Sequence, residues 1–469
     1  MKDLKLISLL KTFSKHEIKD FEKYLQSSFL NKAGEYISIF FESIKKFYPE
    51  FNQENFTRQD IFKNIYPKEK YNDARMRKLI SETMKLCLDF LAMKRFMENE
   101  FDKGIFILDE LEKRNSDTLF EIKCKEISKK LESQKIKDYE YYKEKHELIQ
   151  KNKSFYFNRE RKKAISLYDE EMELLSKYFS LLFIHKFIER FMEKKSFTEK
   201  EFSLPFFKEI TSFIEGNYLG KENLFDLYYT ELMLHVTGEE KYYFSLKHLK
   251  EKLHSKINNN SLSLIYFTLT NYATEQLEQS KTNYLNELFI IQKEILKRKL
   301  YGNIFSEFLY LNIVTTALRV NEIKFAEKFI SEYKYKLNED IREEIYSFCL
   351  ASIYFSKKQY SEALETLAKI HFGFSLHKYL IKNLTMKVHF EMNETEAIYL
   401  IIDSFKHTLK RDKQVPENVR VLIVNFVNFV RELCRIKNGE KQKEDIEERI
   451  KNEITAEKIW LLTKAREFN

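Results

Sequence analysis

The sequence predicts an all-α protein, an α-solenoid of antiparallel helix pairs preceded by an N-terminal helical module. The first observation is that a small residue followed four places later by an apolar residue recurs after 37 and then 34 residues, which is the length of a two-helix repeat unit. The three pairs are Ala326/Ile330, Ala363/Leu367 and Ala397/Ile401. The second observation is that 469 residues include only 8 Gly and 4 Pro, which leaves little material for tight β-hairpin turns and favours uninterrupted helices.

The composition is typical of a folded, soluble chain. Hydrophobic residues make up 43% and aromatic residues 15% of the sequence, which is more than disordered chains carry. No segment reaches the roughly 18 consecutive apolar residues of a membrane span, and the apolar run at the N-terminus is too short for a signal peptide. The 4 cysteines form no CxxC pair. We therefore expect buried thiols in a reducing compartment, and a cytoplasmic protein without membrane contact.

Charge gives little indication of a polyanionic partner. The formal net charge is +8, but basic and acidic residues alternate almost everywhere, whereas a nucleic-acid binder usually concentrates its positive charge in a patch or stripe. Only the N-terminal half keeps a mild basic excess. Most charged residues are therefore interpreted as the solvated faces of helices.

Domain organisation is predicted from helix-capping signals and from the positions of Pro and Gly, which interrupt helices. A Ser or Thr followed three residues later by an acid marks the start of a helix; these pairs are Ser14/Glu17, Thr57/Asp60 and Thr198/Glu201. Pro205, Gly216 and Gly220 mark the best candidate linker. The predicted segments are 1–100, the N-terminal helical module; 101–200, a long helical hairpin or connection; 201–410, the helical repeats; and 411–469, C-terminal capping helices.

The clearest repeat unit reads LASIYFSKKQYSEALETLAKI. Its small residues Ala351 and Ala363 allow two helices to approach closely, and Tyr354 and Tyr360 fill the space beside them. These residues resemble the tetratricopeptide repeat, and the resemblance extends over about residues 304–408. It implies a stack of antiparallel helix pairs whose inner helices line a concave surface.

No motif for chemistry is found in the sequence. Phosphate-binding glycine loops, the HExxH and GxSxG motifs and EF-hand loops are all missing, and the E-x-x-H motif from Glu251 to His254 lacks the second copy that a di-iron site requires. We therefore expect no catalytic residue, no cofactor and no metal. By elimination, the sequence predicts a noncatalytic scaffold that binds a protein or peptide along the repeat surface. An enzyme with a site assembled from scattered helices is a further alternative.

The candidate partner-binding residues are Tyr379, Lys382 and His389. They span three turns of one predicted inner helix, and together they would offer an aromatic platform beside a cation for an acidic segment of a partner. The alternative is that Tyr379 belongs to the core.

A nucleic-acid-associated regulator is the alternative function. Residues 57–95 predict a short helix, a turn containing Pro67 and a second helix that carries Arg75, Arg77 and Lys78 in its first turns. A helix-turn-helix module presents such residues to the groove and the phosphates of DNA. The same geometry is also common in purely structural α-domains.

The C-terminal region predicts an enclosed helix. Residues 419–433 are apolar on nearly every face, so this helix must be covered on most sides. It either caps the solenoid or forms a homodimer interface. Trp460, the single tryptophan, is expected to anchor the end of the array.

Overall fold

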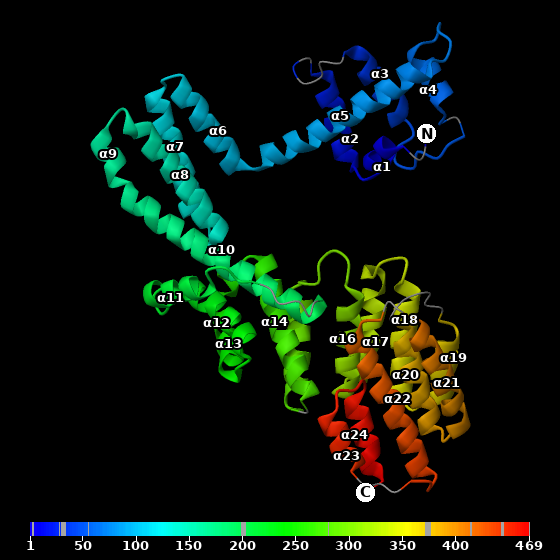
Figure 1. Cartoon of the computed structure of the whole chain (residues 1–469). Coiled ribbons are helices and arrows are strands. Elements are labelled where there is room, and N and C mark those ends of the chain that lie inside the picture. The colour runs from blue at the N-terminus through cyan, green and yellow to red at the C-terminus, as the bar shows by residue number, and fades with distance from the viewer. Residues whose placement is uncertain are drawn as a thin grey trace. The chain divides into compact units, whose positions relative to one another are not determined.

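The computed structural model describes residues 1, 4–27, 29, 34–54, 56–197, 203–279, 281–370, 377–412, 415–441 and 445–468. Within these residues every regular element is helical, which confirms the all-α prediction. The chain forms two compact units (Figure 1). The N-terminal unit comprises Met1–Gln134 and Glu140–Ser176, and the C-terminal unit comprises Lys135–Tyr139 and Lys177–Asn469. The finer division into four segments stays a prediction.

The N-terminal unit is built from helices that follow one another through short loops. They are α1 (Lys5–Lys11), α2 (Lys15–Gln26), α3 (Glu35–Lys45), α4 (Arg58–Ile65), α5 (Asp73–Glu98), α6 (Glu100–Lys113), α7 (Asp117–Glu132), α8 (Tyr139–Phe157), α9 (Arg161–Ser166) and α10 (Tyr168–Phe197). Of these, α8 begins in the C-terminal unit and α10 ends in it.

The capping signals of this unit act as the sequence predicts. Ser14 accepts a hydrogen bond from the backbone N–H of Glu17, and the Glu17 carboxylate accepts one from the N–H of Ser14 at 2.8 Å. Lys94 of α5 also binds this carboxylate, and these hydrogen bonds lower the pKa of Glu17 to about 2. Thr57 accepts from the N–H of Asp60. The third predicted pair, Thr198/Glu201, lies outside the described residues.

Aromatic side chains form the two cores of the N-terminal unit. Helices α1 to α5 enclose Phe21, whose ring meets that of Phe41 edge-on at 4.9 Å between centroids and lies 5.3 Å from that of Phe90. Helices α6 to α9 enclose a second core. There Phe120 of α7 and Phe155 of α8 stack at 3.8 Å with nearly parallel rings. Both cores bury large apolar areas, which is what stabilises a helical module of this size.

The C-terminal unit continues with paired helices. They are α11 (Phe207–Asn217), α12 (Asn223–Thr237), α13 (Glu240–Leu253), η1 (His254–Lys256), α14 (Asn259–Glu278), α15 (Tyr284–Lys297), α16 (Glu307–Arg319), α17 (Ile323–Tyr333), η2 (Lys334–Lys336), α18 (Arg342–Ser356), α19 (Tyr360–Ala368), α20 (His377–Glu391), α21 (Thr395–Arg411), α22 (Glu417–Lys437), α23 (Ile446–Asn452) and α24 (Lys458–Glu467).

Helix pairs in this unit pack in chain order. Helix α12 packs on α13, α14 on α15, α16 on α17, α18 on α19 and α20 on α21. In addition α16, α18, α20 and α22 each contact the next member of this set, so that they form a continuous row of helices lying side by side (Figure 1). This contact pattern agrees with helix pairs stacked one after another.

The repeat unit singled out in the sequence is the pair α18 and α19. Both of its small residues, Ala351 and Ala363, are completely buried. Lys358, in the turn between the helices, adopts a left-handed backbone conformation with φ 61°. Such a conformation reverses the chain direction after a helix. The predicted helices and the turn between them are therefore confirmed.

The C-terminal helices pack on the row formed by α16, α18, α20 and α22. Helix α22 carries the apolar segment 419–433, and its residues Phe426, Val430 and Leu433 are fully buried within the chain. Helix α24 packs on α22. Trp460 of α24 meets Phe390 of α20 edge-on at 5.3 Å. The segment is thus largely covered by the chain itself, and a homodimer through it stays a prediction.

Two further expectations concern thiols and membranes. Cys87, Cys124, Cys349 and Cys434 are all buried and free, as predicted. Burial raises the pKa of Cys87 to about 12 and that of Cys434 to about 11, so these thiols stay protonated. None of the described helices combines the length and the apolar character that a membrane span requires.

Candidate functional site

Tyr379, the aromatic residue of the predicted site, lies in the core. Its ring is only 2% exposed and packs 5.5 Å from that of Phe405. Its hydroxyl donates a hydrogen bond to the Asp412 carboxylate at 2.9 Å. Burial and this carboxylate raise the pKa of Tyr379. The structure thus places Tyr379 as the core alternative describes, and the ring offers no platform at the surface.

Lys382 and His389 lie on the same helix as Tyr379, but they bind different neighbours. The Lys382 ammonium donates to the hydroxyls of Ser404 at 3.2 Å and Thr408 at 3.3 Å. Burial, together with the nearby Lys378, lowers the pKa of Lys382. The Nδ1 atom of His389 lies 2.6 Å from a carboxylate oxygen of Glu394. Lys382 and Tyr379 share one neighbour, because the Lys382 ammonium lies 5.3 Å from the centroid of the Phe405 ring on which Tyr379 packs, whereas His389 is held by Glu394.

The cations of the nucleic-acid alternative are each paired locally. Arg75 forms an ion pair with Glu69 and stacks over the ring of Tyr66 at 4.6 Å. The Nε atom of Arg77 lies 2.9 Å from the Asp73 carboxylate.

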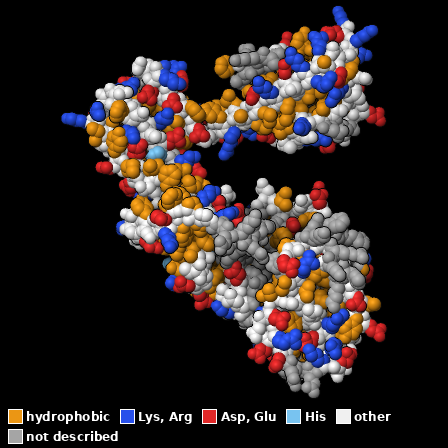
Figure 2. All heavy atoms as spheres, viewed as in Figure 1, with side chains coloured by type: hydrophobic (Ala, Val, Ile, Leu, Met, Phe, Trp, Pro, Cys, Tyr) orange, Lys and Arg blue, Asp and Glu red, His pale blue; other side chains and the backbone are white. Residues whose placement is uncertain are grey.

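Lys78, the third of these cations, lies 3.8 Å from Glu82 on the next turn of α5. On the face shown in Figure 2, basic and acidic side chains are interspersed. No observation therefore favours a phosphate-binding stripe in residues 57–95, and nucleic-acid binding by this module stays a hypothesis.

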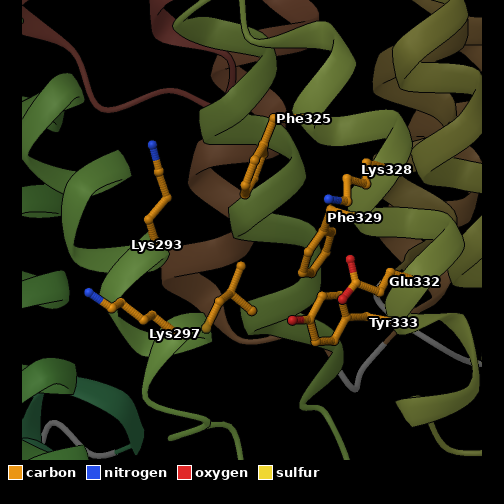
Figure 3. A pocket seen from close by; sticks show the side chains of 8 residues that line it. Lys293, Lys297, Phe325, Lys328, Phe329, Glu332 and Tyr333 are labelled. Atoms are coloured by element: carbon orange, nitrogen blue, oxygen red, sulfur yellow. The ribbon is translucent and has the colours of Figure 1, made fainter.

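A different surface site lies between α15 and α17 in the C-terminal unit. It is a cavity of about 240 Å³ lined by Lys293, Leu296, Lys297, Phe325, Lys328, Phe329, Glu332 and Tyr333. Figure 3 shows two lysines of α15, Lys293 and Lys297, on one side of the cavity, and the aromatic rings of α17 together with Lys328 on the other. The site combines an apolar floor with a charged rim.

The aromatic floor follows from the spacing of residues along α17. Phe325, Phe329 and Tyr333 occur at intervals of four, so they occupy one face of the helix. Successive rings stack, with centroids 6.3 Å apart for the first pair and 5.0 Å for the second. Phe329 is buried, whereas Phe325 and Tyr333 are half-buried. The floor therefore exposes apolar ring surface that the fold does not fully cover.

The rim is rich in unpaired positive charge. Lys293, Lys297 and Lys328 are exposed, and among the described residues none of them has a carboxylate within ion-pair distance. Glu332 is the single acid that lines the cavity. Three cations against one anion leave a local excess of positive charge beside the aromatic floor.

Acidic residues near the cavity form ion pairs with other helices, which explains the local excess of positive charge. Glu287 of α15 pairs with Lys247, and Glu294 of α15 lies 2.7 Å from Lys250; both lysines belong to α13. Glu327 of α17 pairs with a lysine at the end of α18. These three carboxylates of α15 and α17 thus bind to adjacent helices, and the lysines on the cavity side have only Glu332 beside them.

Sequence reasoning missed this site. The spacing of Phe325, Phe329 and Tyr333 is visible in the sequence, but it also fits a buried helix face. Two of the three lysines, Lys293 and Lys297, come from a helix about 30 residues earlier in the chain, and the lack of ion-pair partners for all three depends on which lysines of other helices bind the nearby acids. Neither property can be read from spacing alone.

A comparison of the chain with protein-family models, curated proteins and solved structures found no match. Among the described residues, no group of three or more His, Cys, Asp or Glu side chains is placed to hold a metal ion. At the E-x-x-H motif, the Nδ1 atom of His254 lies 2.8 Å from the backbone carbonyl of Glu251. The geometry of the α15–α17 cavity is therefore the main guide to function.

Proposed function

We propose that the protein is a noncatalytic, cytoplasmic scaffold that binds an acidic segment of a partner protein on a solenoid of tetratricopeptide-like helix pairs. Two features support the scaffold. Helix pairs from α12 to α21 pack in chain order, and residues 304–408 resemble the tetratricopeptide repeat. Arrays of this type present extended surfaces, and their function is recognition rather than chemistry.

The observation that carries the proposal is the α15–α17 cavity, where lysines without an ion-pair partner lie beside stacked aromatic rings. A carboxylate beside Lys293 or Lys328 gains attraction without displacing an existing ion pair. An apolar side chain on the exposed faces of Phe325 and Tyr333 removes apolar surface from water, at roughly 25 cal/mol per Å². The site therefore fits a peptide that carries an apolar residue flanked by Asp or Glu.

The size of the cavity restricts the ligand. Its volume of about 240 Å³ is below the roughly 300–1,000 Å³ of typical small-molecule pockets, so it holds one or two side chains rather than a large cofactor. The exposed lysines should mainly raise the association rate constant, because charges at the rim of an interface attract an oppositely charged partner before contact. Salt screens this attraction. A short acidic peptide segment with one apolar side chain fits both the small volume of the cavity and its positively charged rim.

The test is a selection of short random peptides on the full chain, followed by calorimetric titration of the enriched sequences. We expect these peptides to combine acidic with apolar residues. Their affinity should fall between about 50 mM and 300 mM salt, since the contacts are charged and exposed. The double variant Lys293→Glu/Lys328→Glu should weaken binding by about ten-fold or more, because it reverses the charge of the rim.

The matched control is Lys324→Glu. Lys324 is an exposed lysine on the same helix as Lys328, but it does not line the cavity. This variant should bind the selected peptides as the unmodified protein does. Selected peptides without acidic residues, or equal loss of affinity in Lys324→Glu and in the double variant, would contradict the proposed site.

A further inference from the structure

Helix α15 also lines a second cavity. It has a volume of about 210 Å³ and is enclosed by α14, α15 and α16 together with Leu422 of α22 and residues 455–459 at the start of α24. Its lining differs from that of the first cavity, because it contains five threonines and two amides in addition to leucines. Hydroxyl and amide groups both donate and accept hydrogen bonds, so this lining suits a polar occupant.

Gln292 supplies the most specific observation. Its side chain lines the cavity and is only 1% exposed. Its Nε2 atom donates to the hydroxyl of Thr316 at 3.1 Å, whereas its Oε1 atom is buried and has no hydrogen-bond partner among the described residues. A buried acceptor left without a partner carries a desolvation cost. A ligand that donates an N–H or O–H to this oxygen would remove that cost.

Charge defines the second requirement of the ligand. Arg319 of α16 lines the same cavity, and among the described residues no carboxylate lies within ion-pair distance of its guanidinium; it does act at longer range on Glu457, because Lys387 and Arg319 together lower the pKa of that carboxylate. Glu457 also lines it, but its carboxylate is already bound by Lys387 of α20 at 2.8 Å. The guanidinium of Arg319 thus forms no close ion pair with Glu457, and its planar geometry matches a carboxylate in a bidentate pair.

We infer that this cavity binds a small carboxylate that also bears an amino or hydroxyl group, that is, an amino acid or an α-hydroxy acid. The carboxylate pairs with Arg319, the amino or hydroxyl group donates to the Gln292 Oε1 atom, and the threonine hydroxyls satisfy the remaining polar atoms. The leucine side chains exclude water from one wall, which strengthens both polar contacts. This inference is independent of the peptide site between α15 and α17.

The experiment measures thermal melts of the full chain by circular dichroism with small L-amino acids and the corresponding α-hydroxy acids. Propionate, which has the carboxylate without the donor, and glycerol, which has donors without the carboxylate, are the matched controls. At least one amino or hydroxy acid should raise the melting temperature, and calorimetric titration should then give its dissociation constant. The two ligand sets decide whether the donor is an ammonium or a hydroxyl group.

Two variants connect binding to the cavity. Arg319→Gln and Gln292→Met should each weaken binding by about ten-fold or more, the effect expected for one charged or buried hydrogen bond. Lys324→Gln, an exposed cation outside the cavity, should leave it unchanged. The inference is overturned if no acid in either set raises the melting temperature. It is equally overturned if propionate or glycerol binds as well as the best acid, or if binding survives both cavity variants.

Discussion

Glu231 is a carboxyl group enclosed by the fold. It lies on α12, is 2% exposed, and accepts a hydrogen bond at 2.9 Å from the hydroxyl of Thr268 on α14. The Nε2 atom of His235 lies 3.1 Å from the same hydroxyl. Burial raises the pKa of Glu231 to about 8, so at neutral pH the group is held mainly as the neutral acid.

This environment predicts a pH-dependent contribution to stability. The unfolded glutamate ionises near its ordinary pKa of 4.5, whereas the folded one keeps its proton up to about 8. Between these values the folded state binds more protons, so the free energy of unfolding should fall as the pH rises. Glu231→Gln removes this dependence. In urea denaturation, the variant should therefore gain stability relative to the unmodified protein from about pH 5 to about pH 8.

The control for this prediction is Glu209→Gln, which changes an exposed carboxylate on α11. It should shift the urea midpoint equally, and slightly, at both pH values. A Glu231→Gln effect that does not vary with pH would mean that Glu231 is ionised in the folded protein.

At the scale of elements, the pair α18 and α19 makes a packing prediction. Ala363 is completely buried, and a phenylalanine there has no space. Ala363→Phe should therefore cost roughly 1–3 kcal/mol by overpacking, seen as a lower melting temperature in circular dichroism. Lys357→Ala and Lys358→Ala, in the turn, should have little effect, because the former removes only a partly exposed ion pair with Glu327. If Ala363→Phe leaves the melting temperature unchanged, the predicted repeat register is wrong.

Elements were predictable from the sequence wherever the signal is local. The hydrogen bonds between Ser14 and Glu17 lie within one helical turn, and the start of α5 at Asp73 follows from its Asn72 cap. Small residues at repeat spacing identified the α18–α19 pair. Each of these features depends only on neighbours that are close in sequence.

The candidate site was not predictable in the same way. Helix α20 has buried residues on several sides, including His377, Tyr379 and Asn383, so its apolar pattern does not define one exposed face. The burial of Tyr379 is decided by Phe405 and Asp412, which lie 26 and 33 residues later. In the same way, the free lysines of the α15–α17 cavity depend on ion pairs between helices. Long-range pairing of this type has no short-range signature.

At the scale of the whole molecule, the division into two units predicts separable unfolding. Ile44 of α3 and Ile345 of α18 are both fully buried, one in each unit. Replacing either by alanine leaves a cavity and should cost about 2–5 kcal/mol. Because each unit encloses its own cores, scanning calorimetry should show that Ile44→Ala lowers one transition and Ile345→Ala lowers another. A single transition that both variants shift together would mean that the units unfold as one.

Trp460 has an optical consequence. It is the only tryptophan in 469 residues, and its indole N–H donates to the Glu391 carboxylate at 3.2 Å while its ring lies against Phe390 and Phe426. Indole emission moves to longer wavelength when the ring enters water. Excited at wavelengths that tyrosine does not absorb, the whole protein therefore emits light from one point, where α24 meets α20 and α22. The wavelength of that emission therefore reports, without any added label, whether α24 is packed against α20 and α22.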